Sequence, residues 1–260
     1  MEALAQSLSA ALPAEIFAYF LVFVRVGAAL QSMPGLGEIS IPQRIRLAVG
    51  LLLTVVVAPV VGPTLPPLPE SAILMAGLVL GETLIGIFIG LAGRFAMSAL
   101  IVAGSIISQQ IALSSATLFD PSFGQQGAAV SAWLVAVALT IVFVSDLHHL
   151  MLRAVADSYT LFPAGQLAPL GSYAEALVRW TAHSFLIGVQ MSAPFLVFGL
   201  VINLALGLIA RLQPAIQVFF IAQPALIAVG LLAMGLTIVA TMQAFERGLL
   251  DKLEPLLLVP

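Results

Sequence analysis

The sequence predicts an all-α, polytopic membrane protein of six to seven apolar, proline-kinked helical segments arranged as hairpins. Hydrophobic residues make up 61% of the 260-residue chain and charged residues only 8%, whereas soluble domains have roughly 45–50% and about 25%. Apolar runs long enough to cross a bilayer, about 17–25 residues, alternate with connectors that contain proline and glycine. In lipid, every backbone N–H and C=O must be bonded within the protein, which favours helices over open strands.

The apolar runs define the expected helical segments in chain order. They are Ile16–Leu30, Ile45–Val61, Ala72–Leu91, Phe95–Leu113, Ala128–Val144, Phe185–Leu206 and Ile216–Thr241. The first is short and the fourth is partly polar, so we expect six or seven segments. Two longer stretches, Ser114–Gly127 and Ser145–His183, are predicted to be loops. Residues 1–260 are expected to form a single membrane domain.

Composition and charge exclude several functional classes. The chain has no cysteine, so disulfides, iron–sulfur clusters and thiol nucleophiles are excluded. Its net charge of −3 provides no basic surface for nucleic acid. The single lysine is Lys252, and therefore no glycine-rich phosphate loop can precede a lysine elsewhere.

A carboxylate in the middle of the third apolar run is a candidate functional group. Glu82, Gly86 and Gly90 are spaced four residues apart and therefore share one helix face. The two glycines let another helix backbone approach closely, so we expect Glu82 to lie at a helix contact rather than toward lipid. Three interpretations are open: a protonated or hydrogen-bonded carboxyl, a proton relay, or an ion pair with Arg25 of the first run, because charges in apolar helices usually pair.

The fourth apolar run carries a polar face that leads into an uncommon loop. The face contains Ser98, Ser105, Ser108, Gln109 and Ala112. Such a face either packs against another helix through hydrogen bonds or lines a wet path. The following loop holds no Lys or Arg and has an Asp120-Pro121 turn former at its centre. At membrane depth, non-helical backbone is tolerated only within protein or around a water-filled cavity. The alternative is a loop in solvent.

Side chains suited to acid–base or metal chemistry are few. His148 and His149 are adjacent, so on a helix they point about 100° apart, which argues against a shared metal. Histidines at a helix end beside Asp146 are the favoured interpretation. Ser105 and His183 are the best available pair for an intramembrane serine protease, yet no nucleophile motif flanks Ser105. We therefore expect no catalytic, metal-binding or cofactor-binding residues.

A series of short stretches carries a family resemblance. In order, they are Arg25–Gly27, Met33–Gly37, Ile41–Arg46, Glu82 with Gly86 and Gly90, Gln109–Gln110 before Asp120–Pro121, His148–His149, Ser158–Tyr159, Pro163–Gly165, Ala193–Pro194, Asn203, Gly207, Arg211–Pro214, Gln217–Phe219 and Gln223–Pro224. Together they resemble the FliR family of flagellar biosynthetic proteins, part of the type III export gate, whose injectisome counterpart is closely similar. The chain departs from this pattern at Ser145–Asp146, where small glycine-like residues are expected, and at Glu38.

The resemblance implies a non-enzymatic, channel-forming subunit in the bacterial inner membrane, within the flagellar basal body. Members of the family assemble with FliP-like and FliQ-like membrane subunits, an FlhB-like switch protein and the basal-body ring, and unfolded flagellar proteins pass through the assembly. No cofactor and no nucleic acid are implied. Two alternatives stay open: an injectisome export-gate subunit, and a secondary transporter subunit that uses Glu82.

The resemblance also implies residue roles. It places Ile106–Gly127 in a plug that closes the channel. The plug and pore candidates are Ser108, Gln109, Gln110, Ser114, Ser115, Phe119, Asp120, Pro121 and Phe123. The candidates for packing between subunits are Pro34, Pro42, Arg44, Arg211, Pro214 and Pro224.

Overall fold

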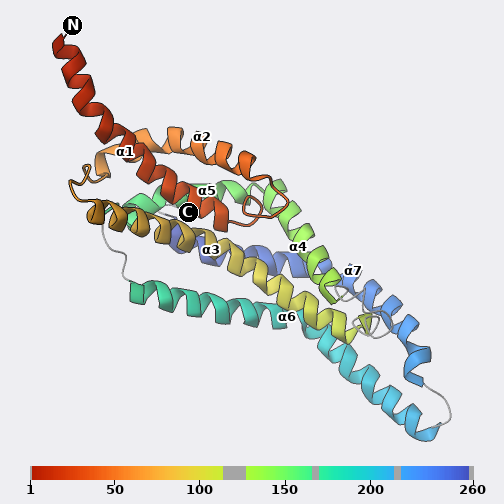
Figure 1. Cartoon of the computed structure of the whole chain (residues 1–260). Helices are drawn as coiled ribbons and strands as arrows, with labels where there is room; N and C mark the ends of the chain where they lie inside the picture. Colours follow the sequence, from red (N-terminus) through yellow and green to blue (C-terminus); the bar gives the residue numbers. More distant parts are fainter. Residues whose placement is uncertain (1, 114–126, 166–169, 214–217, 258–260) are drawn as a thin grey trace. The chain divides into compact units, whose positions relative to one another are not determined.

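The computed structural model describes residues 2–113, 127–165, 170–213 and 218–257 (Figure 1). Its helices are α1 (Glu2–Ser32), α2 (Gln43–Val61), α3 (Ala72–Gln110), α4 (Gly127–Val144), α5 (Leu147–Leu161), α6 (Leu170–Leu212) and α7 (Val218–Leu253), with short 3-10 helices η1 (Gly62–Thr64) and η4 (Glu254–Leu256). No strand occurs in these ranges. The all-α class predicted from the sequence is therefore confirmed.

Membrane-spanning length is reached by five of these helices. The apolar stretches are Leu12–Ser32, Gln43–Thr64, Ala72–Gln110, Gly171–Leu212 and Ile221–Leu256. A sixth candidate is the pair α4 and α5, which together pass the same test but meet at a bend of 73°. These spans confirm a polytopic membrane protein.

The third and fourth predicted segments form one helix rather than two. α3 runs unbroken for 39 residues through Gly93 and Arg94, where the sequence suggested a boundary. A glycine inside a helix costs about 1 kcal/mol relative to alanine, but here it fits a packing constraint. A Cβ at Gly93 would lie 2.7 Å from Pro34 Cδ and 3.1 Å from Met151 Sδ, so a side chain would displace both neighbours.

The prediction of a loop over Ser145–His183 is wrong. This stretch contains α5 and the first part of α6. α5 buries one face along its length through Leu147, Met151, Ala154, Val155, Ser158 and Tyr159. Charged residues on the other face, such as Arg153, reduce its hydropathy. A search for continuous apolar runs misses a helix of this amphipathic kind.

Several prolines lie inside helices. Pro59 is in α2, Pro194 in α6 and Pro224 in α7. Each removes one backbone donor from its helix. The kinks expected at Pro194 and Pro224 stay a prediction, and Pro214 lies outside the described residues.

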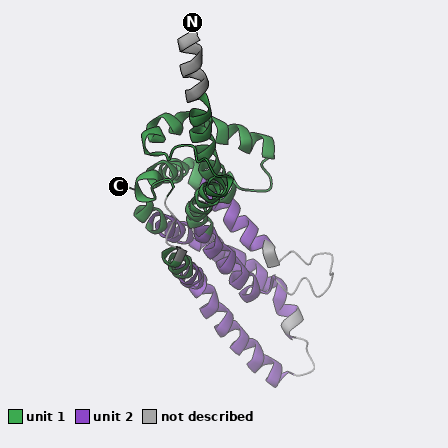
Figure 2. Cartoon of the chain, turned by 60° about the vertical axis from the view of Figure 1, so that its left-hand side comes forward, with its two compact units in different colours: residues 1–94, 142–180, 251–260 green, residues 95–141, 181–250 purple. Residues whose placement is uncertain are grey.

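Contacts divide the chain into two compact units, which Figure 2 colours separately. Unit 1 comprises residues 1–94, 142–180 and 251–260, and unit 2 comprises residues 95–141 and 181–250. The fully buried apolar side chains of unit 1 include Leu21, Val22, Leu30, Met33, Ile85, Ile89 and Met151. Those of unit 2 include Leu100, Ile107, Ile111, Leu134, Ala138, Phe195 and Phe245.

In unit 2, the C-terminal end of α3 lies beside the hairpin of α6 and α7, which we call the second hairpin (Figure 1). Gln110 and Ile111 face Gly199 of α6 and Gly230 of α7, which lie more than ten residues from the C-terminal end of α6 and the N-terminal end of α7, respectively. The polar end of α3 therefore lies along the side of this hairpin.

Large apolar side chains cover much of the surface of α6 and α7. Exposed examples are Phe185, Val197, Leu200, Leu204, Leu208, Leu212, Ile221, Leu232, Leu236 and Val239. Scattered exposed apolar residues are ordinary in soluble proteins, but continuous apolar surfaces of this kind face lipid or other proteins.

Candidate functional site

A buried ion pair joins α1 and α3 within unit 1. Arg25 Nε donates to Glu82 Oε2 over 2.6 Å. The side chains are 0% and 2% exposed, so water screens the pair very little. Of the three interpretations of Glu82, the structure shows the ion pair. Removing one partner of such a pair leaves an uncompensated buried charge and typically costs about 3–5 kcal/mol.

The end of α5 supplies the remaining partners of Arg25. Its Nη1 donates to Ser158 Oγ over 3.2 Å, and its Nη2 donates to Phe162 O over 3.0 Å. The guanidinium carbon lies 3.9 Å from the centroid of the Tyr159 ring, within the range of a cation–π interaction. Arg25 therefore connects α1, α3 and α5. Sequence reasoning missed α5, although the amphipathic spacing of its buried residues could have revealed it.

The glycines that follow Glu82 bring the backbones of α1 and α3 together. A Cβ at Gly90 would lie 2.5 Å from Ala29 O and 2.5 Å from Ser32 Cβ. A Cβ at Gly86 would collide with Arg25 O. The close backbone approach expected from the small residues is therefore present, and it places Glu82 against α1 at the height of Arg25.

Two arginines hold the turn between α1 and α2. Arg94 donates from Nε to Ser32 O over 3.2 Å and from Nη2 to Gly37 O over 3.3 Å. These bonds satisfy carbonyls at and beyond the end of α1, which lack partners inside the helix. Arg46 donates from Nε to Leu36 O over 2.9 Å, and also bonds Glu38 O and Gln31 Oε1.

Three subunit-packing candidates lie at this same turn. Pro34 contacts the position of Gly93 on α3, and Pro42 occupies the N-cap position of α2 with φ −55°. Arg44 lies in the first turn of α2 and is exposed. The structure brings these residues together on unit 1; their role between subunits stays a prediction.

The polar face of α3 packs against neighbouring helices of unit 2. The hydroxyls of Ser105 and Ser108 donate to carbonyls of α3 itself, Val102 O and Ser105 O. Hydroxyls on other helices bridge to α3: Ser131 of α4 donates to Ile101 O over 3.1 Å, and Ser184 of α6 donates to Phe95 O over 2.6 Å. This stretch of the polar face therefore supports packing.

The last turn of α3 lies against both helices of the second hairpin. Gln110 contacts α6 so closely that a Cβ at Gly199 would collide with its Oε1. Ile111 lies just beyond the helix and contacts α7 in the same way, because a Cβ at Gly230 would collide with the Ile111 side chain. Gln109 is the exposed residue of this turn.

Several predicted site residues lie outside the described residues. They are Ser114, Ser115, Phe119, Asp120, Pro121, Phe123 and Pro214. Of the candidates on the second hairpin, Arg211 is exposed in the last turn of α6, where its charge complements the helix dipole, and Pro224 lies inside α7.

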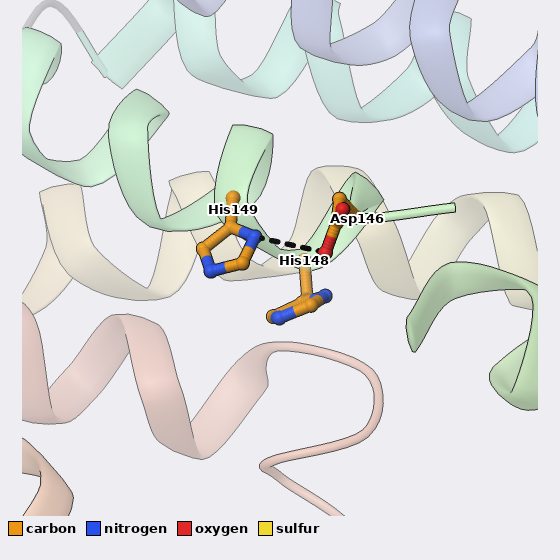
Figure 3. A group of neighbouring side chains, drawn as sticks. All are labelled: Asp146, His148 and His149. Atoms are coloured by element: carbon orange, nitrogen blue, oxygen red, sulfur yellow. Dashed lines mark ion pairs between the residues drawn. The ribbon is translucent and has the colours of Figure 1, made fainter. Parts of the chain in front are cut away.

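The two adjacent histidines lie in the first turn of α5, at a helix end as the sequence predicted. His149 Nδ1 lies 3.3 Å from Asp146 Oδ1, and Figure 3 shows this contact beside the ring of His148. One ligand atom from each of the three residues lies within 4.8 Å of the others, a proximity that regular helical geometry does not predict. Ser105, by contrast, makes its hydrogen bond within α3.

Comparison with known proteins gives a consistent result over nearly the whole chain. Residues 16–251 match the family described as bacterial export proteins, family 1. The flagellar biosynthetic protein FliR of Caulobacter vibrioides is 42% identical over 224 residues, which cover 86% of this chain and 89% of that protein. FliR of Escherichia coli is 32% identical over 83% of this chain and 82% of its own, and FliR of Bacillus subtilis is 29% identical over 84% of each. The chain therefore belongs to the bacterial export proteins, family 1, and is a multi-pass protein of the inner membrane.

Proposed function

We propose that this protein is a structural, channel-forming subunit of the flagellar type III export gate. The observation that carries the proposal is its similarity to flagellar biosynthetic proteins, which reaches 42% identity over 86% of the chain. Its partners are then FliP-like and FliQ-like membrane subunits, an FlhB-like switch protein and the basal-body ring, and its cargo is unfolded flagellar protein. The relatives are flagellar proteins by name, which favours this role over the injectisome.

The lengths of the helices support a place inside a larger assembly. α3, α6 and α7 contain 39, 43 and 36 residues, or about 54–65 Å at 1.5 Å per residue. The hydrocarbon core of a bilayer is only about 30 Å thick. On α6, exposed apolar side chains recur from Phe185 to Leu212, a stretch of about 40 Å. Sister subunits in the gate would cover the apolar surface that lipid does not reach.

We propose further that residues 106–127 contribute the plug of the gate. This stretch begins in the last part of α3, which the second hairpin holds through its contacts with Gln110 and Ile111. It contains no Lys or Arg, and most of its polar residues are Ser and Gln, whose uncharged side chains suit cargo of varied sequence. Phe119 and Phe123 supply the apolar side chains that a constriction needs to exclude water and ions.

The plug is tested by changing its phenylalanines in the assembled complex. Deleting residues 114–123 is expected to make the membrane conduct small ions at rest. Replacing Phe119 and Phe123 together by alanine should raise the resting conductance, whereas replacing both by leucine, which keeps an apolar constriction, should leave it low. Unchanged conductance of the deletion variant in a complex that assembles normally would refute the plug.

The role in flagellar export is tested in the bacterium that carries this protein. Deleting the gene is expected to abolish secretion of hook and filament proteins without impairing growth, and the intact chain supplied in trans should restore secretion. Normal filaments in the deletion strain would contradict the function independently of any result on the plug.

A further inference from the structure

We propose that Asp146, His148 and His149 form a binding site for one divalent transition-metal ion. The site lies where α4 ends and α5 begins, at the bend of 73°. Two imidazole rings and one carboxylate from one short stretch converge there (Figure 3). The inference does not depend on the proposed role in export.

The distances between the donor atoms are close to those of a metal site. One ligand atom from each residue lies within 4.8 Å of the other two. Bonds of about 2.0–2.2 Å from zinc to nitrogen and oxygen place two tetrahedral ligands about 3.4 Å apart. The pair of His149 Nδ1 and Asp146 Oδ1 already has a separation of 3.3 Å, so rotation of exposed side chains completes the set.

The surroundings of His148 orient its ring for coordination. Its Nδ1 lies 3.4 Å from Val142 O. A proton on Nδ1 directed at this carbonyl leaves Nε2 with a free lone pair, which is the arrangement that second-shell carbonyls impose on metal-binding histidines. The ring of Phe143 packs beside the imidazole, with centroids 5.0 Å apart, and limits the rotation of the histidine.

The backbone and side chain of Asp146 are not explained by helix capping. The residue occupies the N-cap position of α5, where an aspartate usually accepts a hydrogen bond from the first turn. Here it adopts a left-handed conformation with φ 56°, and its side chain makes no capping bond. Aspartate is one of the few non-glycine residues that adopt this conformation, because its short polar side chain can form local hydrogen bonds. Its carboxylate faces His149 instead, which is the position of a metal ligand.

The donor set selects the kind of ion. Two imidazoles and a carboxylate, without a thiolate, suit Zn²⁺ and its first-row neighbours better than Ca²⁺ or Mg²⁺, which prefer oxygen ligands alone. Three protein ligands leave a fourth position for water or for a group from a partner. The side chains of Asp146 and His149 are 76% and 66% exposed, so no described part of the chain blocks the approach of an ion.

The test measures zinc binding by the full-length chain, purified in detergent without a polyhistidine tag and stripped with a chelator. Calorimetric titration is expected to give one Zn²⁺ per chain. D146N, H148Q and H149Q should each weaken binding by at least about tenfold, the scale of losing a supporting group in known sites. H183Q changes the third and last histidine of the chain and should leave the affinity unchanged.

A second measurement separates this site from nonspecific binding. Co²⁺ substituted for Zn²⁺ should show visible absorption bands of a low-coordinate site, and H148Q and H149Q should remove them while circular dichroism shows an unchanged helical fold. The proposal is overturned if the wild-type chain does not reach one Zn²⁺ per chain at large molar excess, or if any of the three variants binds Zn²⁺ as tightly as the wild type.

Discussion

Arg25 and Glu82 form an ion pair whose side chains are almost completely buried, with 2.6 Å between Nε and Oε2. The same guanidinium donates to Ser158 and to the carbonyl of Phe162. A single arginine therefore holds α1, α3 and α5 together in unit 1. Because Arg25 lies on α1 and its partners come from α3 and from the end of α5, the energetics of the pair report directly on the packing of the unit.

Breaking the pair from one side should destabilise the protein more than removing both charges. R25M or E82M alone leaves a buried charge without a counterion, and we expect a loss of about 3–5 kcal/mol. The double variant R25M/E82M should recover part of that loss, because no unpaired charge is left. Recovery will be incomplete, since the bonds to Ser158 and Phe162 are also lost. Denaturant unfolding in detergent micelles, followed by circular dichroism, measures all three variants. Strictly additive losses would show that the two side chains do not interact.

A methyl group on α3 should have opposite effects at two glycines. G90A places a Cβ 2.5 Å from the backbone of α1, and overpacking of this kind costs about 1–3 kcal/mol. G77A, on the same helix, meets no atom within 4 Å and should stabilise the chain by up to about 1 kcal/mol through helix propensity. Unfolding midpoints of the two variants make the comparison. Equal shifts would mean that α1 and α3 are not in close contact at Gly90.

The turn after α1 should depend on Arg46 and not on its neighbour Arg44. R46L removes the bonds to Leu36 O and Glu38 O, and we expect a loss of about 1–3 kcal/mol because these carbonyls accept from a charged donor. R44L is the matched control, since Arg44 is exposed and makes no hydrogen bond with the part of the chain that the structure describes. Thermal unfolding of the isolated chain distinguishes the two; comparable destabilisation by R44L would contradict this assignment.

Serine hydroxyls that donate to another helix should contribute more to stability than hydroxyls that donate within α3. S184A deletes the donor to Phe95 O at 2.6 Å and should cost about 0.5–1.5 kcal/mol. S105A deletes a bond to the same helix, to Val102 O, and should be close to neutral. Hydrogen exchange of α3 amides offers a local readout. Greater loss of protection in S105A than in S184A would argue against packing as the role of the interhelical bond.

Much of the fold could be predicted because lipid and apolar partners impose continuous hydrophobic runs. Those runs located α1, α2, α4 and the apolar parts of α3, α6 and α7. They could not reveal α5, whose charged face lowers its hydropathy while Met151 and Tyr159 are buried on the other face. They also divided α3 at Arg94, because a charge lowers hydropathy without breaking a helix.

In the candidate site, contacts that follow from residue type could be predicted, whereas contacts that depend on backbone geometry could not. The pair of Arg25 and Glu82 could be inferred because charges in apolar helices need partners. The bond from Arg25 to Phe162 O could not, since a backbone carbonyl leaves no mark on the residue type. The meeting of Asp146 with both histidines depends on one left-handed residue at a bend, which the expectation of regular helical geometry could not provide.

The central claim is that the long apolar helices are buried against sister subunits. The mass of the solubilised particle tests this claim most directly. The chain, tagged and purified in mild detergent from membranes that contain the rest of the apparatus, is expected to elute in a particle several times larger than its own 27.1 kDa, with FliP-like and FliQ-like subunits in fixed ratio. A particle that contains a single copy of this chain alone, and that transports a small solute unaided in liposomes, would contradict the account.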